Sequence, residues 1–477
     1  MSRKMPQRKL LVIYGIGIIL AIAGLVAAVC LTRTPLPISN PEEKLNAAIA
    51  QLDLNHFSYT TTSKTTTTIL EESFTETKTS YITIGRNENG LLEYSATESI
   101  QIGTHTFELQ EAFENGTCYT IINGTGFVCE ISEDTFTERI LPFIPVTVAN
   151  YSHMDGVTQN GTSIITLSQP TNAEKWYDSD GLTLNGATAV FEISKNNDIR
   201  QITYTCAYII GDRSLELSVI ITPSDRESHI VFPDDKNSYI AVDSPDIPRI
   251  LEVACGYLLS AKSISAAYSD SILCEAFGDQ RTQSITLHAA QDTSWTAYTQ
   301  THIQVSNSSK SDADTSFSKR EHFDGTTLTT TIDSNAPTQE TPDDPESVKS
   351  ACQDVLVGTI ILPWHIRSID VVDTGSTIRI NFTATEDFAL LLSNEACTTL
   401  YRDGQVLSNL AADYRTQFVT CYLEIDKSTN LPTASGFSYE GIYDIEGYSY
   451  RLTFSADQQY TILGDKATEK IKEGTDR

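Results

Sequence analysis

The chain has 477 residues and carries 62 acidic against 33 basic side chains, which gives a net charge of −29 at pH 7. A surface of that sign repels phosphate groups, which argues against nucleic acid as a partner. At roughly 100–200 residues per domain, the length favours about two to four domains, each able to bury its own core.

The first expected element is a transmembrane helix at residues 10–31, a run without a charged side chain. At ~1.5 Å per residue, the run spans a hydrocarbon core of ~30 Å. Basic residues ahead of such a helix are retained in the cytoplasm. Four of them and no acidic residue precede it: Arg3, Lys4, Arg8 and Lys9. We therefore expect a single-pass plasma-membrane protein with a cytoplasmic tail at residues 1–9 and an extracellular C-terminal region.

Two alternatives to an uncleaved anchor stay open. Residues 1–30 could be a cleaved signal peptide, or Cys30 could carry a lipid. Val29 is larger than the residue that either signal prefers before the cut, and the apolar run exceeds the ~7–15 residues usual for a signal peptide. The anchor is therefore the preferred interpretation.

The remaining chain follows one plan twice. We expect a first extracellular β-rich domain at 43–224, a linker at 225–244, a second such domain at 245–465 and a charged tail at 466–477. Each copy begins with a helical pattern and continues with Thr- and Ser-rich segments that alternate apolar and polar residues, which is typical of strands. The alternative is that any two antiparallel meanders share turns and alternation.

A short apolar insert recurs within each copy. The two inserts are Ile140–Leu141–Pro142–Phe143 and Ile361–Leu362–Pro363–Trp364. A second correspondence is a predicted hairpin near the end of each copy, at 191–199 and at 423–431. Duplication accounts for both correspondences.

The second hairpin carries a family resemblance. Its residues Ile425–Asp426–Lys427–Ser428–Thr429–Asn430–Leu431–Pro432 resemble a hairpin of the LolA/LppX-like lipoprotein-carrier fold. That resemblance implies a curved antiparallel sheet wrapped around helices, with an apolar cavity for acyl chains. The predicted fold class is therefore α+β: a transmembrane helix followed by two tandem domains, each a curved antiparallel β-sheet packed on a few helices. In the first copy the turn lacks the Asp, Thr and Pro.

Eight cysteines follow the apolar run, and none forms a CxxC pair. Cys118 and Cys129 are the best local candidates for a disulfide, because a turn at Asn123–Gly124 would bring their strands together. The alternative is that all eight are free thiols, several of them small buried apolar residues.

Motifs of catalysis are missing from the sequence. It contains no HExxH, no nucleophile elbow, no phosphate-binding loop and no dinucleotide fingerprint. We therefore expect a non-enzymatic protein without a cofactor or a metal site.

Two functions fit these observations. The first is a membrane-anchored extracellular binding protein that holds a lipid-like or apolar ligand. Its expected ligand-binding residues come from the two inserts: Trp364, Leu362, Ile361 and Phe143. The alternative is a structural or adhesive envelope surface protein with no small-molecule ligand. The expected partners are a lipid or apolar ligand and the membrane itself, through residues 10–31.

Overall fold

The structure is a computed structural model. It describes residues 35–52, 56–69, 72–140, 151–170, 183–210, 213–224, 238–261, 264–276, 279–291, 297–307, 315–350, 361–389, 401–402, 405–406, 414–427, 430–445 and 448–461.

The first large sheet has thirteen strands, in the order β1-β8-β9-β10-β11-β12-β2-β3-β4-β5-β6-β7-β13. Its strands are β1 (Leu36–Pro37), β2 (His56–Ile69), β3 (Glu72–Arg86), β4 (Leu92–Ile102), β5 (His105–Glu114), β6 (Thr117–Ile122), β7 (Thr125–Glu130), β8 (Tyr151–Gln159), β9 (Thr162–Pro170), β10 (Thr183–Ile193), β11 (Ile199–Ile210), β12 (Arg213–Pro223) and β13 (Ile240–Ala241). Two helices accompany it, α2 (Pro41–Ile49) and α3 (Glu133–Ile140).

The second large sheet has eleven strands, in the order β19-β18-β17-β16-β15-β14-β26-β25-β24-β21-β20. Its strands are β14 (Ile264–Ala276), β15 (Asp279–Gln291), β16 (Ala297–Asn307), β17 (Thr315–Phe323), β18 (Leu328–Ile332), β19 (Thr338–Glu340), β20 (Ile366–Asp373), β21 (Thr377–Ala384), β24 (Tyr414–Asp426), β25 (Pro432–Ile445) and β26 (Tyr448–Thr461). The helix α4 (Ile247–Ser260) precedes it, and the 3-10 turn η6 (Pro363–His365) precedes β20; β22 (Tyr401–Arg402) and β23 (Gln405–Val406) form a separate pair.

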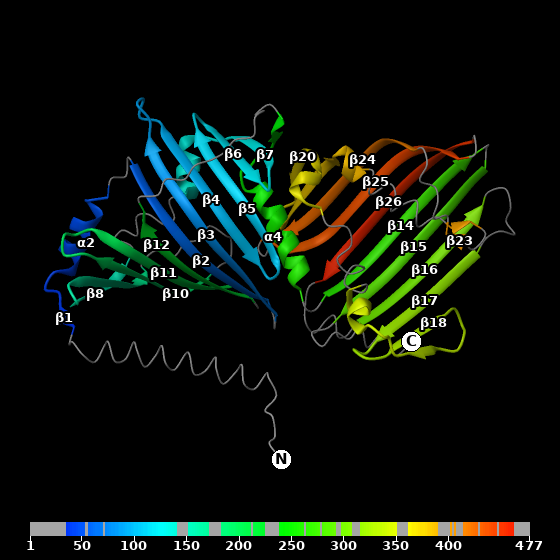
Figure 1. Cartoon of the computed structure of the whole chain (residues 1–477), viewed down its shortest axis with the longest axis horizontal. Coiled ribbons are helices and arrows are strands. Elements are labelled where there is room, and N and C mark those ends of the chain that lie inside the picture. Colours follow the sequence, from blue (N-terminus) through cyan, green and yellow to red (C-terminus); the bar gives the residue numbers. More distant parts are fainter. Residues whose placement is uncertain are drawn as a thin grey trace, which may run out of the picture.

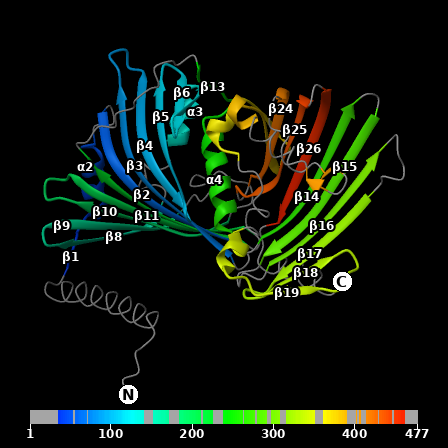
Figure 2. The same cartoon turned by 45° about the vertical axis from the view of Figure 1, so that its right-hand side comes forward.

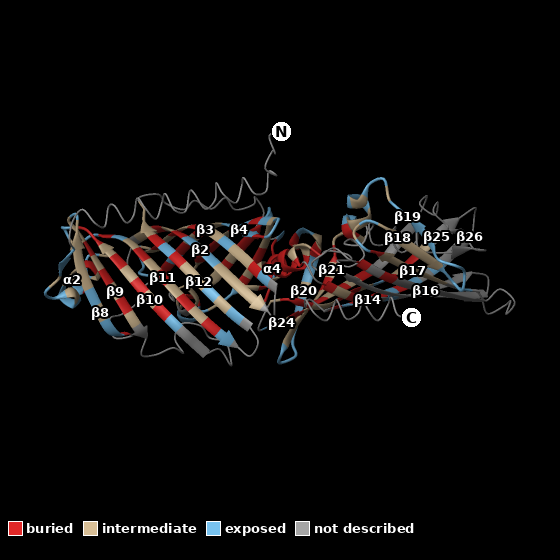
Figure 3. Ribbon diagram, turned by 90° about the horizontal axis from the view of Figure 1, so that it is seen from below, coloured by how far each residue is buried: buried red, intermediate tan, exposed pale blue. Residues whose placement is uncertain are grey.

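Period-two alternation explains why these segments form sheets. In β4, Leu92, Tyr94 and Ala96 are buried, whereas the residues between them are exposed or half-buried. Figure 3 shows buried and more exposed residues alternating along the strands. Hydroxyl side chains cover much of the outward face, where they form cross-strand pairs such as Ser58 with Thr83 at 3.1 Å.

The two sheets share one order of connections. In the first sheet, β2 begins a meander that runs through β7 to one edge, and β8 to β12 return from the other edge until β12 pairs with β2. In the second sheet, β14 begins a meander that runs to β19, and β20, β21 and β24 to β26 return from the other edge until β26 pairs with β14. These closing pairs are β12 with β2 and β26 with β14, both antiparallel. The predicted hairpins are present as β10–β11 and β24–β25. Each turn has an asparagine with positive φ two residues before the returning strand, Asn197 at 71° and Asn430 at 56°, a conformation that asparagine tolerates well.

The helix α4 lies between the two sheets (Figures 1 and 2). It contacts β4, β5 and β6 on one side and β25 and η6 on the other. One core cluster contains buried residues of both sheets, including Tyr59 and Ile82 from the first and Ile380 and Phe454 from the second. A smaller cluster joins the β4–β5 hairpin to α4 and to Ile264 of β14.

The predicted α+β class is wrong, because strands dominate the described chain and only a few helices accompany them. The expected division into two tandem domains, each with its own helical cover, is not found. The longest described helix, α4, packs against the first sheet as well as the second, because its apolar residues extend around more than one face. This helix ends at Ser260, and Ile264–Ala276 is a strand. The residue bounds of the predicted domains stay a prediction.

The single-pass location is also corrected. Residues 10–31, which carry the predicted transmembrane helix, lie outside the described part of the chain. Within the described ranges, no helix is long and apolar enough to cross a membrane. The longest, α4, has 14 residues; at ~1.5 Å per residue, it is shorter than a hydrocarbon core of ~30 Å. The prediction of a plasma-membrane protein held by one helix, with a cytoplasmic N-terminus and an extracellular C-terminal region, is therefore wrong for the described residues.

Candidate functional site

A band of polar side chains crosses the inward face of the first sheet, between its two apolar clusters. Thr61 on β2 lies opposite Ser80 on β3, which in turn lies opposite Glu98 on β4. Glu98 lies between two apolar inward residues of β4, Ala96 and Ile100. Burying polar groups in this way is costly unless they find partners.

Glu98 finds two partners on the neighbouring strand β3. Lys78 Nζ lies 3.0 Å from its Oε1 atom, and the Ser80 hydroxyl donates to the same oxygen at 3.0 Å. Burial alone would raise the pKa of Glu98, but the positive charges of Lys78 and Arg249, together with these hydrogen bonds, lower it to about 2. The Glu98 carboxylate is therefore ionised at neutral pH.

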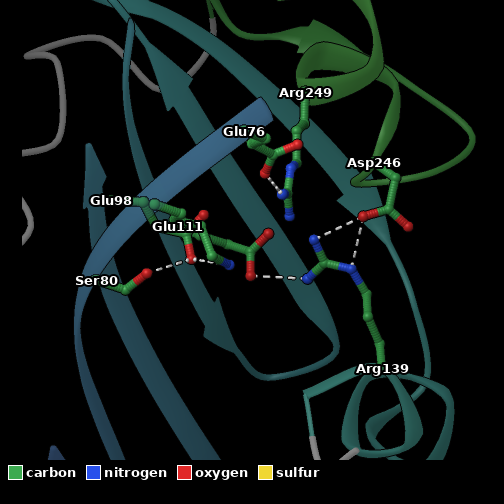
Figure 4. A network of polar contacts seen from close by, with 8 residues as sticks. Glu76, Ser80, Glu98, Glu111, Arg139, Asp246 and Arg249 are labelled. Atoms are coloured by element: carbon green, nitrogen blue, oxygen red, sulfur yellow. Dashed lines mark hydrogen bonds and ion pairs between the residues drawn. The ribbon is translucent and has the colours of Figure 1, made fainter. Parts of the chain in front are cut away.

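Two arginines on the helices complete the network, as Figure 4 shows. Arg139, in the last turn of α3, lies 2.7 Å from Glu111 of β5 and 2.8 Å from Asp246. Arg249, in the first turn of α4, lies 2.7 Å from Glu76 of β3. Burial alone would lower the pKa of each guanidinium, but the adjacent carboxylates raise it above its ordinary value. The network thereby fixes α3 and α4 to the inward face of the sheet.

A cavity of about 290 Å³ lies at this band, close to the lower limit of ~300 Å³ for ligand pockets. Its walls include the apolar side chains of Ile82, Leu217 and Val219. Its polar lining includes three hydroxyl groups of β2: Thr61, Ser63 and Thr65. Within the described residues, none of these three hydroxyls has a hydrogen-bond partner, although Thr61 is only 7% exposed.

A second depression, of about 500 Å³, lies on the polar face of the second sheet. The Arg379 guanidinium stacks 3.8 Å from the centre of the Tyr422 ring, and the Tyr422 hydroxyl donates to Asp457 at 2.7 Å. The ring lies over Gly436, where a Cβ atom would come within 2.5 Å of it. The depression is more open than the first cavity, and its hydroxyl groups pair with one another, for example Ser368 with Thr383 at 2.6 Å.

The residues predicted to bind a ligand lie elsewhere. Phe143 is outside the described residues. Ile361 is buried, Leu362 is half-buried and Trp364 is 40% exposed, next to the His365 ring that stacks on Phe388 at 3.9 Å. These three lie together at η6 and line neither cavity. Their role in binding stays a prediction.

Sequence reasoning missed the charged residues of the band. The sequence does indicate that Glu98 is unusual, because this charged residue occupies an inward position in the alternation of β4, between Ala96 and Ile100. Arg249 is likewise one of two charged residues, with Glu252, in a largely apolar helix. Their partners depend on the strand register and on where α3 and α4 lie, which no local pattern indicates.

Comparison with known proteins assigns no family. No family model and no curated protein matches the chain. Among solved structures, LprF from Mycobacterium bovis matches 42% of this chain and 98% of its own at 10% identity, with a TM-score of 0.25. A putative outer membrane protein from Bacteroides fragilis matches 86% of this chain and 98% of its own at 7% identity, with a TM-score of 0.15. Both scores are too low to assign a fold.

Proposed function

We propose that the chain is a non-enzymatic binding protein that holds an amphipathic, lipid-like ligand in the cavity of the first sheet. The observation that carries this proposal is one cavity that combines apolar walls with hydroxyl groups of β2 that have no hydrogen-bond partner among the described residues. The apolar part of the ligand would contact Ile82, Leu217 and Val219. Its polar end would bond to the hydroxyl of Thr61.

The charge distribution favours a ligand whose polar end is uncharged. Each cation of the band already has a carboxylate partner, for example Lys78 with Glu98 at 3.0 Å. A charged ligand group that entered this cavity would lose hydration, and no unpaired charge of the band would compensate for that loss. Hydroxyl or amide groups would instead satisfy Thr61, Ser63 and Thr65 and leave the ion pairs intact.

The same ion pairs support a binding rather than a catalytic role. An efficient general acid or base has a pKa near the working pH. The Glu98 pKa of about 2 lies far below that range, and Arg139 and Arg249 stay protonated. These groups can hold a polar end in place, but they are poorly suited to transfer protons.

The second candidate function is structural or adhesive surface display without a small ligand. The observation that favours it is the hydroxyl-rich outward face of the first sheet, with cross-strand pairs such as Thr188 with Thr205 at 2.6 Å. In that case, the cavity would hold only water.

Extraction and binding measurements test the two candidates. One sample of the purified full chain would be extracted with organic solvent to recover any bound lipid. A separate folded sample would be titrated with 1-monododecanoylglycerol, dodecanoate and dodecyltrimethylammonium. The binding proposal predicts that the uncharged glyceride binds more tightly than either charged amphiphile of the same chain length. Absence of a stoichiometric lipid in the extract, together with no binding of any of the three probes, would leave only the display function.

A further inference from the structure

Cys118 and Cys129 lie directly opposite each other on the hairpin of β6 and β7. Both thiols are free in the structure and almost fully buried, at 1% and 3% exposure. The two-residue turn at Asn123–Gly124 sets this register, and both residues have positive φ, which is typical of a tight hairpin.

The other described cysteines provide a contrast. Cys206 lies opposite Ala187 and Leu217, and Cys421 lies opposite Phe382 and Phe437. Cys255 is on α4 rather than on a strand. Cys274 of β14 lies opposite Arg281 and Leu452. Within the described strands, only the β6–β7 hairpin therefore places two cysteines in one cross-strand pair.

The spacing of this pair allows a disulfide after a small local shift of the two strands. The Ile131 N–H donates to the Gly116 carbonyl at 3.0 Å, and hydrogen-bonded pairs recur at every second position of an antiparallel ladder. Cys118 and Cys129 are two positions further along and so form a hydrogen-bonded pair, with Cα atoms about 5.5 Å apart. A disulfide spans Cα separations of about 4.4–6.8 Å but Cβ separations of only about 3.5–4.5 Å, whereas the Cβ atoms of a hydrogen-bonded pair lie about 5.5 Å apart. The two strands must therefore move closer together locally when the bond forms, and a bond formed in this way is easier to reduce.

Access to the thiols requires local opening. Burial raises the pKa of both thiols, so both are protonated at neutral pH and react slowly while the hairpin is closed. Among the described strands, β7 is flanked on its other side by the two-residue strand β13 alone. An element so close to a sheet edge opens at a lower free-energy cost than the central strands.

We propose that Cys118 and Cys129 form a reversible cross-strand disulfide, a modification site at the edge of the first sheet. The oxidant is a low-molecular-weight disulfide such as oxidised glutathione. One thiolate attacks it and releases one glutathione thiol, and the second cysteine thiolate then displaces the other. The protein loses two electrons and two protons, and the oxidant takes them up as two thiols.

Peptide mapping tests this proposal with the full chain. The protein is unfolded in urea and refolded in a mixture of reduced and oxidised glutathione, so that burial does not limit access, and free thiols are then alkylated. We expect one dominant linked peptide that joins Cys118 to Cys129 and disappears after treatment with dithiothreitol.

Substitutions supply the controls. Cys118→Ser and Cys129→Ser should each abolish the linked peptide, whereas Cys206→Ser, which removes a buried thiol with no cysteine opposite, should leave its yield unchanged. Two results would overturn the proposal: complete alkylation of Cys118 and Cys129 in the refolded wild-type protein, or a yield of linked peptides that is equal among several cysteine pairs.

Discussion

His105 Nε2 lies 2.6 Å from the carboxylate of Glu252, which is completely buried in the apolar helix α4. This contact joins the start of β5 to the helix that lies between the two sheets. The other carboxylate oxygen of Glu252 has no hydrogen-bond partner within the described structure. His105 is therefore the contact that offsets the cost of burying this carboxylate.

The first prediction concerns removal of that partner. His105→Ala should lower the free energy of unfolding by about 3–5 kcal/mol, because it leaves a buried carboxylate uncompensated. Urea denaturation measures the change. His153→Ala is the matched control, since His153 pairs with Asp155 at 2.9 Å but both side chains are largely exposed. A similar small effect for both substitutions would show that the Glu252 contact contributes no more than a surface pair.

The second prediction is a pH dependence that arises from Glu98. Its pKa in the folded protein, about 2, lies below the ordinary value of 4.5, so the folded state favours the ionised form. The resulting stability is fully present above pH 4.5 and is lost as the pH falls towards 2. It amounts to roughly 3 kcal/mol at neutral pH.

Comparison of wild type with Glu98→Gln over this range measures the contribution. The difference between their free energies of unfolding should be largest at pH 6–7 and should shrink as the pH falls from about 4.5 to 3. A difference that stays constant with pH would mean that Glu98 is not held ionised by Lys78.

The third prediction concerns the Tyr422 stack. A Cβ atom at Gly436 would lie 2.5 Å from the Tyr422 ring and 2.6 Å from the backbone oxygen of Ala456. Gly436→Ala should therefore destabilise the protein by about 1–3 kcal/mol through overpacking. Gly186→Ala on β10 is the control, because a Cβ atom there would meet nothing within 4 Å. Equal melting temperatures of the two variants would contradict the close packing of Tyr422 on Gly436.

Local patterns predicted the strands and the hairpins of this fold. The alternation of Leu92, Tyr94 and Ala96 indicates a strand with one buried face, and the polar turn before Leu431 marks the β24–β25 hairpin. The pairing of β12 with β2 was not predictable, because the same alternation suits any neighbouring strand. The position of α4 between the sheets was missed for a related reason: an apolar helix can cover either sheet.

The candidate site was less accessible to sequence reasoning than the fold. The large side chain and the apolar neighbours of Trp364 suggest a cavity wall, yet the 3-10 turn that begins at Pro363 leaves this residue 40% exposed. The cavity depends instead on Lys78 meeting Glu98 and on Arg139 reaching Glu111, which are contacts between separate elements. Two sequence signals pointed to the site: the inward position of Glu98 in the alternation of β4 and the charge of Arg249 within a largely apolar helix.

Val219 and Ile220 are adjacent on β12 but face opposite sides of the first sheet. Val219 is buried in the wall of the cavity, whereas Ile220 is 38% exposed. A tryptophan at position 219 would fill the cavity, and the same residue at position 220 would extend from the outward face.

Calorimetric titration of 1-monododecanoylglycerol into wild type, Val219→Trp and Ile220→Trp therefore tests the binding proposal most directly, once circular dichroism shows that all three proteins are folded. We predict that wild type and Ile220→Trp bind with equal affinity and that Val219→Trp binds at least about tenfold more weakly, a loss of about 1.4 kcal/mol. Equal affinity of all three folded proteins, or no binding by wild type, would contradict a ligand site in this cavity.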